Sequence, residues 1–130
     1  MDSELNYQIS YGKTLVPVYR VYATPLTGVW ANYPYLHNGS VPTLYQVLKS
    51  DARPRLFTRS YKTGEADYDP VRMGWKYTEL TAPPSAKLHP HEARKIYDTS
   101  KPGRSNGGHT YGDKFTDAER TAVIEYLKTL

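Results

Sequence analysis

Residues 34–44 read PYLHNGSVPTL and carry the most informative run of local signals in the chain. Two prolines and two glycines within residues 23–40 argue against a continuous helix or strand, so we expect an ordered loop or a short broken helix there, rich in aromatic rings. A short helix is predicted to follow over residues 40–48, with Ser40 as a possible cap and Pro42 tolerated in the first turn. Leu44 and Leu48 recur at helical spacing on one face of this helix.

The residues before this stretch alternate in the manner of strands. Polar and apolar residues alternate over residues 5–11, and Gly12 then offers the first position of a two-residue hairpin turn. The second arm, residues 15–22, contains Pro17, which lacks the amide donor that a central strand needs. We therefore expect a short N-terminal hairpin whose second arm is an edge strand.

The residues after this stretch divide into an irregular part and a helix. Residues 51–101 show little periodicity, and we expect a long surface excursion there with a turn near residues 62–65. Thr116 and Glu119 have the spacing of a capping box and precede apolar residues at helical intervals. This pattern predicts an amphipathic helix at the C-terminal end of the sequence.

Composition sets the class of protein. A chain of 130 residues fits a single domain, residues 1–130. Thirteen tyrosines, ten prolines and nine glycines favour an aromatic, partly polar core and short elements joined by loops. The net charge of +4 permits an acidic partner or nucleic acid but requires neither. No run is long and apolar enough to span a bilayer, and we expect no signal peptide within this chain.

The absence of cysteine removes several chemistries at once. It excludes disulfides, thiolate metal sites, cysteine nucleophiles and the Cys-x-x-Cys-His attachment of haem c. The best remaining ligands for iron or zinc are four histidines, His37, His89, His91 and His109.

Each histidine also has an ordinary structural explanation. His109 lies among three glycines that would let the backbone approach a flat ligand, although a flexible turn with an exposed imidazole explains it too. His37 lies close to several rings, although backbone groups can satisfy a loop histidine. The prolines around His89 and His91 favour an ordinary loop over a metal site.

Two blocks of the sequence together resemble a known family. Residues 22–48, which contain the PYLHNGSVPTL stretch, and residues 106–130, which begin NGGHTYG, are similar to the C-terminal region of bacterial dihaem cytochrome c peroxidase-like proteins. The likeness is strongest to the branch related to the rubber-cleaving haem dioxygenases. Residues 68–74, YDPVRMG, add a weaker similarity.

The resemblance implies a mainly α fold with extensive loops: a cytochrome c-like C-terminal domain of a few short helices. It implies a haem, with His109 as an axial ligand of the iron, because the stretch after the first helix offers no methionine and Met73 lies too far along. The residues that it places at the haem are His109, His37, Trp30, Tyr35, Asn38 and Tyr111.

Without cysteines, however, this chain cannot attach a haem covalently. Three explanations stay open: a piece of a longer protein, a domain that docks on a haem-bearing chain, or a scaffold that has lost its haem. The resemblance implies a periplasmic, peroxidase- or oxygenase-like electron-transfer protein that is inactive alone. One alternative hypothesis is a haem-free binding module that holds a protein or nucleic-acid partner on a basic, tyrosine-rich surface; the basic stretch over residues 49–62, which includes Phe57 and Tyr61, could contact nucleic acid. Another is a small metal site formed by His89, His91 and one other ligand.

Overall fold

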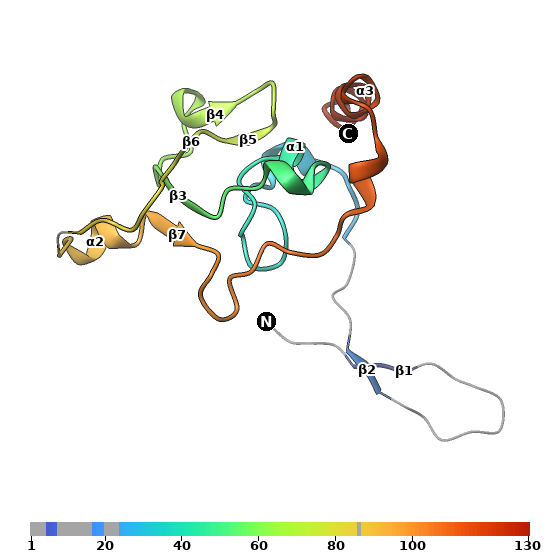
Figure 1. Ribbon diagram of the computed structural model, residues 1–130. Coiled ribbons are helices and arrows are strands. Elements are labelled where there is room, and N and C mark those ends of the chain that lie inside the picture. The colour runs from blue at the N-terminus through green and yellow to red at the C-terminus, as the bar shows by residue number, and fades with distance from the viewer. Residues whose placement is uncertain (1–4, 8–16, 20–23, 86) are drawn as a thin grey trace.

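The computed structural model describes residues 5–7, 17–19, 24–85 and 87–130 (Figure 1). The strands are β1 (Leu5–Tyr7), β2 (Pro17–Tyr19), β3 (Leu56–Arg59), β4 (Tyr68–Asp69), β5 (Gly74–Trp75), β6 (Tyr77–Glu79) and β7 (Ile96–Asp98). The α-helices are α1 (Leu44–Val47), α2 (Pro90–Ala93) and α3 (Asp117–Leu127). Four 3-10 turns complete the regular structure: η1 (Val29–Ala31), η2 (Ser50–Ala52), η3 (Glu65–Asp67) and η4 (Tyr111–Lys114).

The expectation of a mainly α fold is wrong. In the part of the chain that the structure describes, seven strands form three small antiparallel sheets, and two of the three α-helices are only four residues long. Prolines and glycines interrupt most of the sequence, so helices cannot propagate beyond one turn except near the C-terminal end. None of the described helices has the length and apolar character to cross a membrane.

Helix α1 begins later than the sequence pattern indicates. Its N-cap is Thr43 and not Ser40: the Thr43 backbone N–H and hydroxyl both donate to the Gln46 side-chain oxygen, at 3.2 and 2.7 Å. This is a capping box in which glutamine occupies the third helical position. The helix ends after Val47, and η2 follows almost at once.

The hairpin of β4 and β5 supplies acceptors for the start of α1. Leu44 N–H donates to the Met73 carbonyl at 2.7 Å, and Tyr45 N–H donates to the Arg72 carbonyl at 3.1 Å. The first N–H groups of a helix lack partners within the helix, so these two bonds satisfy donors that would otherwise stay unpaired. Residues 68–74, the stretch with the weaker family similarity, are thereby hydrogen-bonded to residues 22–48, the block that contains α1.

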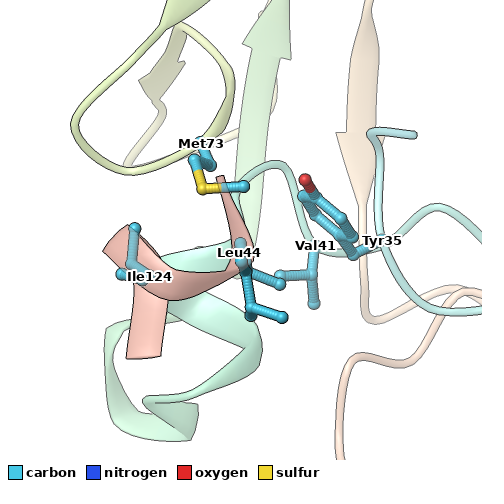
Figure 2. Packing of buried hydrophobic residues seen from close by; sticks show 6 residues of the cluster. Tyr35, Val41, Leu44, Met73 and Ile124 are labelled. Atoms are coloured by element: carbon cyan, nitrogen blue, oxygen red, sulfur yellow. The ribbon is translucent and has the colours of Figure 1, made fainter. Parts of the chain in front are cut away.

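The hydrophobic core lies where α1, this hairpin and α3 meet (Figure 2). Met73 and Ile124 approach Leu44 from one side, and Val41 and Tyr35 continue the cluster. Val41 and Met73 are fully buried, and burial of such side chains stabilises by about 1.5–3 kcal/mol each. The core thus uses residues from three distant segments of the chain.

Residues 51–101 are not a structureless excursion. Strand β3 lies in the middle of a three-stranded antiparallel sheet, between β6 and β7. Its Phe57 is fully buried, stacks on Tyr97 with ring centroids 5.4 Å apart, and meets the edge of Tyr77 at 5.7 Å. Aromatic packing of this kind stabilises beyond its buried area.

The helix predicted near the C-terminal end and the hairpin predicted near the N-terminal end are both present in the structure. Thr116 caps α3, and its hydroxyl and Glu119 form the predicted capping box. The expected N-terminal hairpin is present as β1 and β2, with Leu5 opposite Tyr19 and Tyr7 opposite Pro17. Its predicted turn at Gly12 lies outside the described residues.

Helix α3 is fastened to the residues after α1 through polar contacts. The Arg120 side chain is 3% exposed, and its guanidinium donates to the Leu48 carbonyl at 3.0 Å and to the Phe115 carbonyl at 2.8 Å. The Asp113 carboxylate accepts from the Ser50 backbone N–H at 2.7 Å and from the Ser50 hydroxyl. These two hydrogen bonds hold the pKa of Asp113 below its ordinary value, the hydroxyl contributing most.

Gly74→Ala tests the join between the β4–β5 hairpin and α1. A Cβ at Gly74, whose φ is 150°, would lie 2.2 Å from the Pro42 carbonyl oxygen, so the two segments would have to separate. We expect a loss of about 3 kcal/mol in the free energy of unfolding, measured by urea denaturation. The control is Gly103→Ala, where φ is 75° but no atom lies within 4 Å of the added Cβ. Equal losses at the two positions would contradict the described packing.

Asp113→Asn tests the contact between η4 and Ser50. Because the folded pKa of Asp113 is lowered, its stabilising effect is present above the unfolded value of about 3.9 and disappears as the pH falls through the folded pKa. Thermal unfolding at pH 6 and pH 3 should therefore show a smaller acid destabilisation in Asp113→Asn than in the wild type. Glu79→Gln, an exposed carboxylate at the end of β6, is the control. An unchanged acid destabilisation in Asp113→Asn would refute the contact.

Candidate functional site

Asn38 ties the first block of the family resemblance to the segment that immediately precedes the second block. Its side-chain Nδ2 donates to the Ser105 carbonyl at 2.7 Å and to the Gly103 carbonyl at 3.3 Å, while its Oδ1 accepts from the Ser40 N–H at 3.1 Å. The Tyr97 hydroxyl donates to the Asn38 carbonyl at 2.9 Å. The segment that contains His37 is thereby fixed against residues 103–105, which are more than sixty positions away in sequence.

Arg53 fixes the second block more extensively. Its Nη1 donates to the carbonyls of Asn106 and Gly108 at 2.6 and 2.7 Å, and its Nη2 donates to the His109 carbonyl at 2.9 Å. The same side chain donates to the end of α1, through the Gln46 and Val47 carbonyls at 2.8 and 3.1 Å. We call this set of five bonds the Arg53 clamp.

The Arg53 clamp places its guanidinium in a partly desolvated position. Burial lowers the pKa of Arg53, and the negative charge of Asp113 opposes that shift. Arginine nevertheless stays protonated in proteins, so all its donors remain available to carbonyl oxygens. A lysine at this position would have three donors on one nitrogen and could not span both segments.

His109 is held by its backbone, and its side chain has no hydrogen-bond partner among the described residues. Its φ is 48°, in the left-handed region, and the preceding Gly108 has a φ of 80°. A non-glycine residue in this region is strained, and such strain persists only where the surroundings fix the backbone. Here Arg53 holds the carbonyls of both residues. The imidazole, on an exposed residue, is therefore presented from a fixed support.

The other residues expected at a haem occupy three different environments. His37 is exposed and next to Asn38, and Tyr111 on η4 is 87% exposed. Tyr35 is a core residue whose hydroxyl donates to the Val29 carbonyl at 2.9 Å. Trp30 is 45% exposed and lines a cleft of about 300 Å³ together with Tyr33 and Tyr68.

Met73 cannot serve as a ligand at the surface of this domain. Its side chain is fully buried in the core, beside Ile124 and Leu44 (Figure 2). Met73 was expected to be an improbable axial ligand because of its distance along the sequence, and the structure supplies the physical reason. Among the described residues, imidazole therefore remains the side chain best suited to bind haem iron.

His89 and His91 form a separate, exposed pair. Their Nδ1 atoms lie 2.5 Å apart, and His91 Nε2 lies 3.0 Å from the Glu92 carboxylate, which also binds Lys95. Within residues 24–85 and 87–130, no group of three or more metal-ligating side chains of the His, Cys, Asp or Glu type is arranged to hold a metal ion. The hypothesis of a small metal site has no further support from the geometry.

The basic stretch over residues 49–62 is largely committed to internal contacts. Arg53 forms the clamp, and the Arg59 guanidinium lies 3.6 Å from the centre of the Trp75 ring. Lys49 lies 3.8 Å from the Asp117 carboxylate and 5.9 Å from the centre of the Tyr45 ring. Phe57, one of the two rings in this stretch, is buried between strands. The side chains therefore do not form one continuous basic surface.

Sequence reasoning missed the most connected residues of the site. Arg53 appeared only as one of several basic residues, and Asn106 only as part of the glycine-rich block. The Asn106 Nδ2 donates to the Pro54 carbonyl at 2.9 Å, which adds a second link beside the clamp. No local signal identifies either role, because both depend on carbonyl oxygens from another part of the chain.

These contacts bring together the segments on which the cytochrome c-like resemblance rests. Residues 20–58 match the family described as RoxA-like, cytochrome c-like. The match includes His37, Asn38 and Arg53, and it confirms the resemblance that the sequence suggested. This part of the chain is therefore similar to a cytochrome c-like domain.

Two relatives from Sinorhizobium fredii (strain NBRC 101917 / NGR234) are similar over most of the chain. "Uncharacterized protein y4iJ" is 37% identical over 118 residues, which cover 83% of this chain. "Uncharacterized protein y4iM" is 38% identical over 125 residues, which cover 82% of this chain. The chain spans 17% of the length of the first and 26% of the length of the second.

Arg53→Ala tests the clamp. Loss of five charge-assisted bonds to backbone carbonyls should lower the free energy of unfolding by about 2–3 kcal/mol and expose residues 106–109 to faster amide hydrogen exchange. Arg53→Lys should restore little of the loss. Arg55→Ala, at an exposed neighbouring position, should change stability by less than about 0.5 kcal/mol. Unaltered exchange at residues 106–109 in Arg53→Ala would count against the clamp.

Proposed function

We propose that this domain forms one wall of the haem site of a c-type haem oxidoreductase with an electron-transfer or peroxidase- or oxygenase-like role. The observation that carries the proposal is the joining of the His37 and His109 blocks by the Arg53 clamp, supported by the bonds of Asn38 to the residues just before the second block. Because the iron ligand in such proteins must be held in a fixed orientation, a rigid backbone beneath His109 is the feature that the function requires.

The residues present fit a haem in their donor chemistry. His109 offers an exposed imidazole, and imidazole nitrogen is a common axial ligand of haem iron. Trp30 and Tyr111 offer exposed ring surface that a flat apolar macrocycle would cover. By contrast, the cleft beside Trp30 is about 300 Å³ and is lined by neither His37 nor His109. The domain therefore supplies one wall, and a second polypeptide segment would have to supply the other.

The absence of haem-attachment residues also indicates that a second polypeptide segment would complete the haem site. The chain contains no cysteine, so the thioether bonds and the ligand opposite His109 would come from a segment with a Cys-x-x-Cys-His motif. The bound haem would supply the redox chemistry, while this domain would set ligation and exclude water. We expect the domain to be inactive alone. Cytochrome c-like proteins are typically extracytoplasmic, and we expect a periplasmic location.

The haem-free binding module is less well supported. It would use a basic surface that includes residues 49–62 to hold a protein or nucleic acid, but Arg53, Arg59 and Lys49 make contacts within the domain. A free cationic surface requires side chains that are available to phosphate or carboxylate groups. We therefore do not propose nucleic acid as a partner.

His109→Ala tests the proposed ligand. The probe is a short ferric haem peptide that contains its own Cys-x-x-Cys-His motif and leaves one axial position open. With the wild-type domain we expect a shifted Soret band that indicates a second imidazole on the iron, and with His109→Ala we expect the spectrum of the free haem peptide.

Two further histidine variants make the spectrum interpretable. His37→Ala should keep the shifted band and weaken binding, because His37 is expected in the haem pocket and not on the iron. His91→Ala should behave as the wild type, since His91 belongs to the separate pair with His89. An unshifted spectrum with the wild-type domain, or a shift that survives in His109→Ala, would refute ligation by His109.

A further inference from the structure

A second cleft lies beside β3 and β7 of the three-stranded sheet. None of the residues proposed to face a haem lines it. Its volume is about 500 Å³, within the range of roughly 300–1,000 Å³ that is usual for sites of small organic ligands. Its lining includes residues from β3, α2, β7 and the turns on either side of them. It therefore needs an explanation of its own.

The floor of this cleft is apolar. Leu56 on β3 is 6% exposed, and Ile96 on β7 and Leu88 before α2 are half-buried. Pro83, Pro84 and Ala93 continue the apolar lining. An apolar concave surface of this size favours a ligand with a hydrocarbon body, because removing that body from water is the main source of binding free energy. A free phosphate or sulfate would make no use of it.

The rim of the cleft is cationic. Arg94, Lys101 and Arg104 all line it, with Asp98 as the one acidic lining residue. Lys101 N–H donates to the Asp98 carbonyl at 3.4 Å and Arg104 N–H donates to the Lys101 carbonyl at 3.0 Å. These successive turns bring every third residue of the loop to the same side, which explains why residues 98, 101 and 104 line the cleft together.

The single acidic residue is already engaged by its own turn. The Asp98 carboxylate accepts from the Ser100 hydroxyl at 2.6 Å and from the Ser100 N–H at 3.0 Å, and these bonds hold the pKa of Asp98 below its ordinary value. In the described part of the chain, none of Arg94, Lys101 and Arg104 has a carboxylate within 4.0 Å. Three cationic residues and one carboxylate thus line an apolar cleft, which leaves positive charge in excess; the Arg104 guanidinium also lies 5.6 Å from the centre of the Tyr97 ring.

We propose that this cleft binds the free carboxylate of a compact aliphatic acid. The hydrocarbon chain lies over Leu56 and Ile96, and the carboxylate meets Lys101, Arg94 and Arg104 at the rim. Charge complementarity selects an acid over an amine or an alcohol of the same length, because both charge and hydrogen-bond donors favour the carboxylate. This binding is independent of the proposed haem function, since the two surfaces share no residue.

Calorimetric titration with decanoate, kept below its micellar concentration, tests the proposal on the full chain. We expect one decanoate per chain, binding that weakens with added salt, and no saturable binding of decyltrimethylammonium. Decanol should bind several-fold more weakly than decanoate. Decanol that binds as tightly as decanoate would overturn the role of the cationic rim, and the absence of saturable decanoate binding would overturn the site.

Variants locate the binding. Lys101→Glu should weaken decanoate binding at least tenfold, which corresponds to about 1.4 kcal/mol, whereas Lys114→Glu on η4 makes the same change of charge outside the cleft and should leave it nearly unchanged. Ala93→Trp should weaken decanoate and decanol alike by filling the cleft. Equal effects of Lys101→Glu and Lys114→Glu would show that only net charge matters and would overturn the proposal. Lys101→Gln removes the positive charge without adding a negative one, so it should lose an intermediate amount of decanoate affinity. This variant keeps the test valid if Lys101→Glu fails to fold.

Discussion

The guanidinium of Arg53 is the contact on which the arrangement of the domain depends. Five carbonyl oxygens, two at the end of α1 and three in residues 106–109, accept hydrogen bonds from this one side chain. An unpaired carbonyl beneath a packed loop costs free energy comparable to a lost hydrogen bond. Because one rigid planar group satisfies both segments, the chain after β7 is held beneath α1 on its way to α3 (Figure 1).

This contact also links stability to the proposed function. Asn38 fixes the segment of His37 against residues 103–105, and Arg53 fixes the backbone of His109 itself. An iron ligand on a loop is effective when the loop is held by its neighbours, so contacts that serve the fold here also prepare an imidazole for a metal. Under the proposed function, a different polypeptide segment would supply the other wall of the site and the attachment of the haem.

The parts of the fold that sequence predicted are those governed by local chemistry. The capping box at Thr116 and Glu119 identified α3, and alternation around Gly12 identified the β1–β2 pair. The mainly α expectation and the irregular excursion over residues 51–101 were wrong because β3, β6 and β7 pair over long separations and are too short to show a period. Aromatic stacking around Phe57 stabilises this sheet, and the sequence shows it only as scattered tyrosines.

The same distinction applies to the candidate site. The family resemblance named Asn38 and His109 but could not foresee Arg53, because its partners are backbone oxygens that any residue type supplies. The most direct test of the account is the amide NMR spectrum of the domain with the ferric haem peptide, whose unpaired electrons broaden nearby signals. Joint broadening of residues 36–39 and 106–110 is predicted, because in the proposed function both blocks would face one haem. Broadening of one block alone, or of neither, would contradict the account.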